Sequence, residues 1–268
     1  MNKAIKTEVP ALNRGLDIIE ALASEKGELE FSEISKRLKI PRASLARILN
    51  TLRKRRFIDK DEKSGRYRLG LKFIYLVSFV YDKIDIRSYA RPYMVKLAET
   101  TGETIELSTL DHDQLVLVEQ IESEQGIRLY SRIGSAYPYL HTTAPGKVYL
   151  SQMSDEKLER VLNKIGLPKI TENTITEIER LKEELKQVAK KGFAFENQEL
   201  RIGVRRFAAP IFNHENRLVA CLGLAGPFFR IGLRDKARLG RLVKNTADEI
   251  SRKLGAAKIN PKAGTDQS

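Results

Sequence analysis

The residues from Ser32 to Gly70 carry the clearest structural signal in the chain. They read SEISKRLKIPRASLARILNTLRKRR over residues 32–56 and FIDKDEKSGRYRLG over residues 57–70. Ser32 suits the N-cap of a short helix, with Glu33 favourable in its first turn. Pro41 suits the start of a second helix running to about Arg55, because its missing N–H is no loss there. Two short helices with a tight joint predict a helix-turn-helix. The apolar stripe of the second helix is Leu45, Ile48, Leu49 and Leu52.

A β-hairpin is predicted directly after these helices. Phe57 begins an extended run, and the segment Asp61 to Gly65 forms a turn. In Arg66-Tyr67-Arg68-Leu69, basic and apolar residues alternate, so both arginines are expected on one face. A helix-turn-helix followed by such a hairpin is a winged helix. An amphipathic helix from about Ala11 to Ser24, ended by Gly27, precedes it; its stripe is Leu12, Leu16, Ile19 and Leu22.

Positive charge is concentrated in the same stretch. Residues 36–72 hold fourteen Lys/Arg and three Asp/Glu, so they carry 14 − 3 = +11 of the whole chain's +13. A field of this density favours a polyanion, because neutralised phosphates release condensed counterions. The alternative is a solvated basic face. The interleaving of these charges with apolar residues at helix and strand spacings favours a folded reader of DNA. RNA is the weaker option, because the stretch offers no aromatic platform for unstacked bases.

The predicted roles follow from the winged-helix geometry. The helix beginning at Pro41 is expected to enter a major groove, where Arg42, Ser44 and Arg47 meet base edges. The cluster from Arg53 to Arg56 and the hairpin arginines are expected to meet phosphates or the minor groove. The candidate DNA-binding residues are Arg14, Ser32, Arg42, Ala43, Ser44, Arg47, Thr51, Arg53, Lys54, Arg55, Arg66 and Arg68.

The bulk properties indicate a two-domain cytoplasmic protein. The chain has 268 residues, and its one cysteine, Cys221, rules out an intrachain disulfide, as suits a reducing compartment. The polar N-terminus lacks the apolar core of a signal peptide. The most apolar stretch, Leu69 to Tyr81, is interrupted by Lys72 and is too short to span a bilayer. We therefore expect no membrane association.

The sequence gives little support to an enzyme. It contains no nucleophile elbow, phosphate loop or zinc-ligand spacing, and we expect no cofactor and no metal. His112, His141 and His214 are widely separated, and a structural hydrogen bond is expected for His141. An enzyme tethered to DNA through the basic segment remains an alternative class.

The second half of the chain predicts an α+β module with a largely antiparallel sheet. Leu71 to Lys83 is expected to form a helix that bridges the two domains. A long helix is expected before Gly192, and an amphipathic one around Val243. The expected strands are Thr104–Leu110, Leu115–Gln120, Arg128–Ile133, Phe193–Glu199, Val204–Phe212 and Leu218–Leu224, with turns at Asp111–Gln114 and Asn213–Asn216.

Several motifs, in order along the chain, resemble the IclR-type transcriptional regulators. They are Leu12-Asn13-Arg14-Gly15-Leu16-Asp17-Ile18-Ile19, Leu38-Lys39-Ile40-Pro41-Arg42-Ala43-Ser44, Gly65-Arg66-Tyr67-Arg68-Leu69-Gly70, Leu140-His141-Thr142-Thr143-Ala144, Gly203-Val204-Arg205 and Gly226-Pro227. The resemblance implies a winged helix over residues 9–70, a linking helix over 71–88 and a GAF-like effector-binding and oligomerisation domain over 89–256. We expect the tail, 257–268, to be disordered. The resemblance also implies a homodimer or homotetramer on a pseudo-palindromic operator in double-stranded DNA.

The resemblance places an effector pocket in the second domain. Its expected lining, by position, is Ala144, Pro145, Glu196, Arg206, Gly223 and Ala225. Where Arg206 stands the family often has cysteine, and where Gly223 and Ala225 stand it often has serine. A guanidinium is a fork of donors suited to carboxylate or phosphate, so we expect an anionic effector, such as an organic acid. The alternatives are that Arg206 pairs with Glu196 or faces solvent, and that the small residues leave a roomier, more apolar pocket or none.

The expected function is sequence-specific regulation of transcription, with repression as the expected sign and a small metabolite as the control. A constitutive DNA-binding protein, whose second domain only oligomerises, is the alternative.

Overall fold

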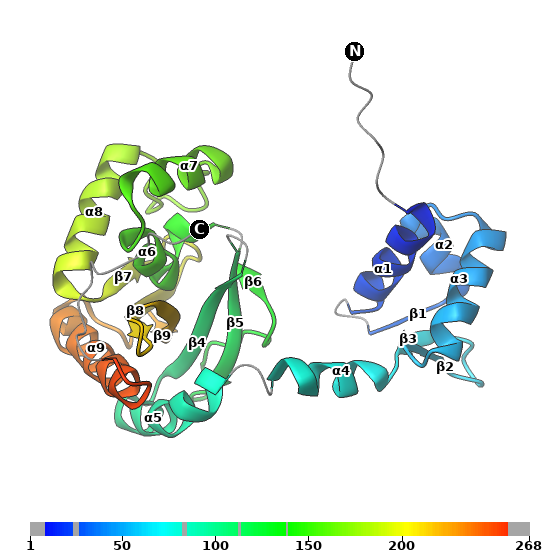
Figure 1. The fold of residues 1–268 in the computed structure, drawn as a ribbon, viewed down its shortest axis with the longest axis horizontal. Helices are drawn as coiled ribbons and strands as arrows, with labels where there is room; N and C mark the ends of the chain where they lie inside the picture. The colour runs from blue at the N-terminus through cyan, green and yellow to red at the C-terminus, as the bar shows by residue number, and fades with distance from the viewer. Residues whose placement is uncertain (1–8, 24–26, 82–84, 112–113, 138, 257–268) are drawn as a thin grey trace, which may run out of the picture. The chain divides into compact units, whose positions relative to one another are not determined.

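The computed structural model describes residues 9–23, 27–81, 85–111, 114–137 and 139–256. The chain divides into two compact units, residues 1–84 and 85–268 (Figure 1). Of the segment expected to link the domains, α4 (Lys72–Tyr81) belongs to the first unit and α5 (Asp85–Thr101) opens the second. The expected end of that linking helix, the middle of the Asp111–Gln114 turn and the tail from residue 257 lie outside the described residues.

The first unit has the predicted winged helix-turn-helix. Its elements before α4 are α1 (Pro10–Leu22), β1 (Glu28–Leu29), α2 (Phe31–Leu38), α3 (Arg42–Lys54), β2 (Ile58–Lys60) and β3 (Tyr67–Leu69). The strands form an antiparallel sheet in the order β1-β3-β2. Ile18, Ile34, Leu45 and Ile58 are fully buried between the helices and this sheet, where they form one core. The stripe predicted for the first helix is wrong at Leu12 and Leu16, which are 60% and 49% exposed, because α1 directs Ile18, Ala21 and Leu22 to the core instead. Burying each such side chain stabilises the fold by about 1.5–3 kcal/mol.

Two predicted helix boundaries in this unit are wrong. The N-cap of α2 is Glu30, not Ser32, which lies in the first turn of the helix. The backbone N–H of Glu30 donates to Oε2 of Glu33 at 2.7 Å, so a glutamate three residues on completes the helix start. The first helix ends at Leu22, before the Ser24 and Gly27 expected from the sequence. The joint after α2 turns at Lys39, whose φ is 52°.

The second unit is a six-stranded sheet in the order β6-β5-β4-β9-β8-β7. All pairings are antiparallel, as predicted. The strands are β4 (Thr104–Asp111), β5 (Gln114–Ile121), β6 (Ala136–Tyr137), β7 (Ala194–Asn197), β8 (Val204–Phe212) and β9 (Leu218–Pro227). The sheet is covered on both faces, which explains why β8 is buried along its whole length.

Helices on opposite faces of this sheet create two apolar layers (Figure 1). One layer packs α5 and α9 (Lys236–Lys253) through residues such as Met94 and Val243. The other packs α6 (Ala144–Ser151), α7 (Asp155–Ile165) and α8 (Ile178–Lys191) through residues such as Val148 and Leu181. Short 3-10 turns at Leu140–Thr142 and Leu233–Asp235 precede α6 and α9.

The strand predicted at Arg128–Ile133 is wrong. The strand that pairs with β5 on its outer side is the shorter β6, which comes after a turn at Gly134, whose φ is 87°. Side chains satisfy backbone groups of the preceding segment in place of a strand ladder. Oε1 of Gln120 accepts from the N–H of Ser131, and Arg230 donates to the carbonyl of Ile127. The period-two pattern of residues 128–133 therefore predicted an edge strand that is longer than the observed one and lies too early in the chain.

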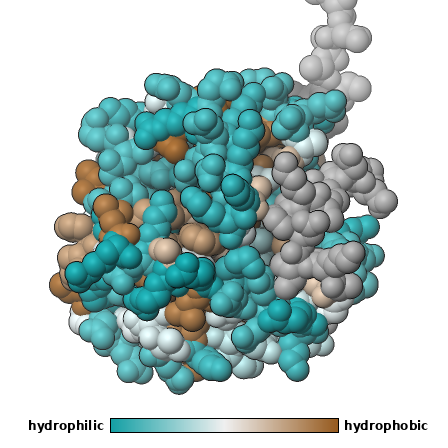
Figure 2. Space-filling model, turned by 90° about the vertical axis from the view of Figure 1, so that its left-hand side faces the viewer, coloured by the Kyte–Doolittle hydropathy of each residue, from teal (hydrophilic) through white to brown (hydrophobic). Residues whose placement is uncertain are grey.

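The surface of the second unit beside α8 and α9 is shown in Figure 2. Hydrophilic residues cover most of this face, and hydrophobic residues gather towards its left-hand side. Large apolar side chains exposed on the unit include Ile202, Phe229 and Leu233. Within the described ranges, no helix has the length and apolar character needed to cross a membrane.

Candidate DNA interface and effector site

The exposed face of α3 carries a continuous row of side chains. Leu45 and Leu49 fix the buried face of the helix. Ala43, Arg47, Asn50 and Lys54, at alternating spacings of four and three residues, are all exposed and lie on the opposite face. Arg47 lies within this row, and its Nε donates only a long, 3.4 Å hydrogen bond to the carbonyl of Ala43. The row therefore presents a guanidinium and a carboxamide one turn apart.

Asn50 was missed by sequence reasoning, although a signal was available. It falls on the same helical face as Arg47, three residues on, and it is not part of the apolar stripe. An asparagine on such a face matches the paired donor and acceptor on the major-groove edge of adenine, and an arginine matches guanine. Asn50 was left out because the candidate residues were chosen mainly for their positive charge, and asparagine is uncharged.

Arg42 and Ser44 lie at the start of α3 and contact neighbouring helices. The guanidinium of Arg42 lies 5.6 Å from the ring centre of Phe31, in α2. Nη1 of Arg14, in α1, donates to Oγ of Ser44 at 3.3 Å. Thr51 is exposed about two turns beyond Ser44, and its hydroxyl donates to the carbonyl of Arg47. Helices α1 and α2 therefore hold the beginning of α3 in place through predicted DNA-binding residues.

The hairpin arginines form ion pairs with acidic residues. Arg66 lies 2.9 Å from Glu30 and 3.8 Å from Glu33, and Arg68 lies 3.8 Å from Glu28. These side chains are all substantially exposed, so the pairs contribute little to stability. The positive field of the wing is nevertheless partly neutralised, which the count of charges between residues 36 and 72 did not include, because Glu28, Glu30 and Glu33 precede that window.

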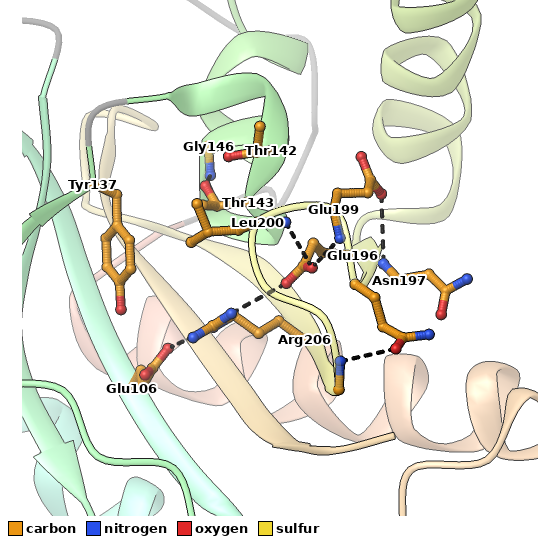
Figure 3. Close-up of polar contacts among 12 residues, drawn as sticks. Glu106, Tyr137, Thr142, Thr143, Gly146, Glu196, Asn197, Glu199, Leu200 and Arg206 are labelled. Atoms are coloured by element: carbon orange, nitrogen blue, oxygen red, sulfur yellow. Dashed lines mark hydrogen bonds and ion pairs between the residues drawn. The ribbon is translucent and has the colours of Figure 1, made fainter. Parts of the chain in front are cut away.

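In the second unit, three buried charged residues converge over the sheet (Figure 3). Nη1 of Arg206, on β8, donates to Oε2 of Glu196, on β7, at 3.3 Å, and its Nε lies 3.6 Å from Oε2 of Glu106, on β4. The three side chains are 5%, 0% and 6% exposed. Tyr137 lies beside them, with its ring centre 6.0 Å from the Arg206 guanidinium. The ion pair with Glu196 is the alternative that the sequence left open.

Strand β9 explains why this arrangement fits. Arg206 lies opposite Ala225, and Glu106 lies opposite Gly223, so β9 separates the arginine from one of its two carboxylates. The guanidinium must reach across β9 to approach Glu106. Small residues at Gly223 and Ala225 leave room for it there. The three positions that differ from the family pattern are therefore neighbours that fit one another.

In this triad of Glu106, Glu196 and Arg206, the surroundings shift the pKa values of Glu196 and Arg206. Burial raises the pKa of Glu196 above its ordinary value, although Arg206 and the N–H groups of Glu199 and Leu200 oppose that shift. Burial lowers the pKa of Arg206, but the two carboxylates raise it by more, so the guanidinium stays charged. Nε of Arg206 is buried and has no hydrogen-bond partner within the described residues. This donor of the fork faces Glu106 at 3.6 Å, which is an ion pair but too long for a hydrogen bond.

Ala144 and Pro145 open helix α6 on the same side of the sheet. Both are buried, and Oγ1 of Thr143 accepts from the N–H of Gly146 at 3.1 Å to cap the helix. Sγ of Cys221, on β9, lies 3.8 Å from the carbonyl of Pro145. The structure therefore brings the start of α6 over β9. Glu106 and Tyr137 were missed, although a glutamate inside the apolar run Thr104–Leu110 was a visible signal.

A second buried ion pair adjoins this site. Nζ of Lys147, in α6, donates to Oε1 of Glu199 at 2.6 Å, and the lysine is 1% exposed. The backbone N–H of Glu199 donates to Oε1 of Glu196, which joins this pair to the triad. His141 is fully buried, and its Nε2 lies 3.2 Å from the carbonyl of Pro168, the structural hydrogen bond expected for it. Among the described residues, no group of three or more His, Cys, Asp or Glu could hold a metal ion.

Comparison with known proteins identifies both halves of the chain. Residues 11–62 match the IclR helix-turn-helix domain, and residues 78–252 match the C-terminal domain of the bacterial transcriptional regulator IclR. The HTH-type transcriptional regulator XynR of Escherichia coli K12 is 32% identical, covering 92% of this chain and 98% of XynR. The transcriptional repressor IclR of the same strain is 27% identical, covering 92% of this chain and 91% of that protein.

Solved structures agree with these matches. The IclR of Thermotoga maritima has a TM-score of 0.78 and 31% identity, covering 91% of this chain and 98% of that one. An IclR homologue of Microbacterium hydrocarbonoxydans, crystallised with 4-hydroxybenzoate, has a TM-score of 0.78 but 20% identity, covering 91% and 99%, and shares the fold. The relatives are transcriptional regulators, which confirms the prediction that the chain is not an enzyme. The chain belongs to the IclR family of bacterial DNA-binding transcriptional regulators.

Proposed function

We propose that this regulator is a cytoplasmic repressor that leaves its operator when a small organic acid binds its second domain. In this proposal residues 9–70 read DNA, 71–88 form the link, and 89–256 bind the effector and assemble a homodimer or homotetramer on a pseudo-palindromic operator. Relatives named as repressors support the sign of regulation. The exposed apolar side chains of the second unit support self-association, because such surfaces often mark interfaces.

The exposed row of α3 is the single observation that carries the DNA-binding part of the proposal. Arg47 and Asn50 have the donors and acceptors that read base edges, whereas Arg53 and Lys54, in the last turn of the helix, suit phosphates. Ser32, in the first turn of α2, is exposed and suits a backbone phosphate. The operator sequence is then set mainly by Arg47 and Asn50.

Nε of Arg206 is buried and makes no hydrogen bond to any described residue, which supports an anionic effector. The triad carries two carboxylates and one guanidinium. A further anion is therefore accepted most easily where it takes over the contact of Arg206 with Glu106, which at 3.6 Å is the longer of the two ion pairs. The start of α6 lies on the same side of the sheet and completes the site. The 4-hydroxybenzoate in the Microbacterium homologue is a carboxylate, which fits this class of ligand.

Control of DNA binding requires that the effector favour one arrangement of the protein. A ligand shifts an equilibrium only by the difference between its affinities for the two states. Release from the operator therefore requires the organic acid to bind more tightly to the DNA-incompetent arrangement.

Thermal unfolding against a panel of organic acids tests the effector proposal. An acid that binds the folded state raises the melting temperature. Arg206→Lys keeps the positive charge but loses the forked donors of the guanidinium, so it should bind the best acid less tightly. Arg206→Ala should abolish the rise in melting temperature that this acid causes. Arg160→Ala, at an exposed position of α7, is the matched control and should behave as wild type. Equal affinity in wild type and Arg206→Ala would remove Arg206 from the site.

The alternative of a constitutive DNA-binding protein has a specific observation in its favour. Glu196 and Glu106 already accompany Arg206, so the triad resembles an internal structural network. If operator affinity stays the same in the presence of every acid that stabilises the fold, the result supports a constitutive DNA-binding protein and contradicts control by an effector.

A further inference from the structure

A groove of about 610 Å³ lies in the first unit, between the end of α3 and the start of α4. Four of its lining residues are cationic and one is acidic, Asp59, so the groove is strongly positive. Its remaining lining is Leu71 and the exposed Tyr75. The four cations are Lys54, Arg55, Arg56 and Lys72.

The backbone builds this groove tightly. Arg56, directly after α3, turns the chain with a φ of 61°. The N–H of Gly70 donates to the carbonyl of Phe57 at 2.8 Å, and a Cβ on Gly70 would collide with the carbonyl of Arg56. The rings of Phe57 and Phe73 pack edge to face with their centres 5.3 Å apart. The start of α4 is therefore pinned against the turn that follows α3.

The cations of the groove are available for an external anion. In the part of the chain that the structure describes, none of Lys54, Arg55, Arg56 and Lys72 lies within 4 Å of a carboxylate oxygen. Nζ of Lys72 lies 4.2 Å from the ring centre of Tyr75. The wing differs, because acidic residues accompany Arg66 and Arg68 there. The groove thus gathers four cations that, among the described residues, have no carboxylate beside them.

We propose that this groove holds a phosphate of the DNA backbone at the edge of the site that α3 reads. The inference rests on the proposed function. Lys54 belongs both to the exposed row of α3 and to the groove, seven residues beyond Arg47, which is about 10 Å along the helix. A DNA strand whose bases meet Arg47 therefore has phosphates within reach of Lys54 and Lys72. A phosphodiester fits a concave cluster of lysine and arginine.

This placement gives α4 a role in regulation. Lys72 and Tyr75 belong to the helix that leads towards the second unit, whereas the base-reading row belongs to α3. A displacement of α4 from the turn after α3 would remove phosphate contacts and leave Arg47 and Asn50 in place. Such a change weakens binding to all DNA without altering which sequence is preferred.

Lys72→Gln in the full-length protein tests the groove. We expect weaker binding to operator and to random DNA by the same factor, and a slope of log K against log salt that is smaller by about one per bound subunit. Lys186→Gln, an exposed lysine of α8, removes the same charge from the second unit and should leave the slope unchanged. Urea unfolding of both variants verifies that they fold.

Ethylation interference locates the contact. Wild type should show at least one phosphate per half-site whose ethylation blocks binding, and Lys72→Gln should lose sensitivity at that phosphate. A slope and an interference pattern identical to wild type would overturn the inference while leaving the proposed function intact. Failure of wild-type protein to prefer any genomic fragment would instead remove the proposed function.

A free polyphosphate has the same phosphate groups as DNA and is the other ligand that could occupy the groove. Calorimetry with pyrophosphate and with inorganic phosphate, in the absence of DNA, distinguishes it. We expect no saturable binding at micromolar concentration. Saturable binding of pyrophosphate that is lost in Lys72→Gln would overturn the assignment to DNA. If Lys72→Gln unfolds, Arg56→Gly, which suits the left-handed φ, serves in the same assays.

Discussion

Arg47 and Asn50 lie one turn apart on the exposed face of α3, and the two residue types read different base pairs. Arg47→Ala should weaken operator binding by about 1–3 kcal/mol while leaving binding to random DNA nearly unchanged. Fluorescence anisotropy with both DNAs at a fixed salt concentration measures this. An equal loss on the two DNAs would show that Arg47 contacts a phosphate.

Asn50→Ala should relax specificity at one A·T pair in each half-site. Selection of bound sequences from a random pool, with wild type and variant side by side, reads this out. The preference for adenine should disappear at that position, and the other positions should stay as they are. Lys36→Ala, at an exposed position of α2, is a useful control. An unchanged consensus in the Asn50 variant would place the carboxamide away from the bases.

At single residues, the sequence predicted partners of some side chains but not their convergence. Glu196 and Arg206 were named together, and they form the ion pair that was one of two alternatives. Glu106 was missed because its approach to Arg206 depends on strand order: β4 and β8 are far apart in the chain and are brought near by β9. Local sequence patterns carry no information about which strands lie next to each other in the sheet.

Among the elements, the wing forms exposed ion pairs with residues at the start of α2. Glu30→Gln should remove the closer of the two carboxylates beside Arg66, leaving Glu33 at 3.8 Å, and should take a negative charge away from the DNA. Affinity for random and for operator DNA should therefore both increase. The effect should be largest at low salt, because such interactions are screened. Glu20→Gln, an exposed position of α1, removes the same charge without touching Arg66. If the two variants behave alike, release of Arg66 has no part in binding.

Helix α6 is joined to the β7–β8 turn by the buried pair Lys147–Glu199. Lys147→Met should lower the free energy of unfolding by roughly 3–5 kcal/mol at neutral pH, because it leaves a buried carboxylate without its cation. The double variant Lys147→Met with Glu199→Gln should recover part of that loss. Urea unfolding of the three proteins measures it, and a single variant as stable as wild type would contradict this role.

The pH dependence of that variant has a defined sign. Burial raises the pKa of Glu199, and Lys147 opposes the shift, so removing the lysine raises the pKa further. The folded state then holds the proton more tightly than the unfolded state does. The penalty is absent below the ordinary carboxyl pKa and grows as the pH rises through the raised value. The loss of stability should therefore be smaller at about pH 5 than at about pH 8.

Elements with a strong periodic pattern were predicted from the sequence, and those defined by distant contacts were not. The apolar stripe of α3 and the alternation around Tyr67 predicted the winged helix because local spacing decides both. Helix α7 went unpredicted, although Ser154 caps it and Leu158 and Leu162 form its buried face. Strand β6 was misplaced because its position depends on the turn at Gly134 and on pairing with β5.

For the whole molecule, charge is divided between the units in the way that the function requires. The residues outside 36–72 hold 34 basic and 32 acidic groups, so that part of the chain is nearly neutral, whereas residues 36–72 are strongly positive. Electrostatic attraction then supplies affinity for any DNA, and the row on α3 supplies the preference among sequences. The two contributions respond differently to salt and can be separated.

The most direct measurement is the affinity of purified protein for the genomic fragments that it selects, compared with random DNA of equal length, across a series of salt concentrations. We expect the selected fragments to bind roughly 10³-fold or more tightly than random DNA, and both affinities to fall steeply as salt increases. Equal affinity for selected and random fragments, or binding insensitive to salt, would contradict a basic winged helix that reads sequence through α3.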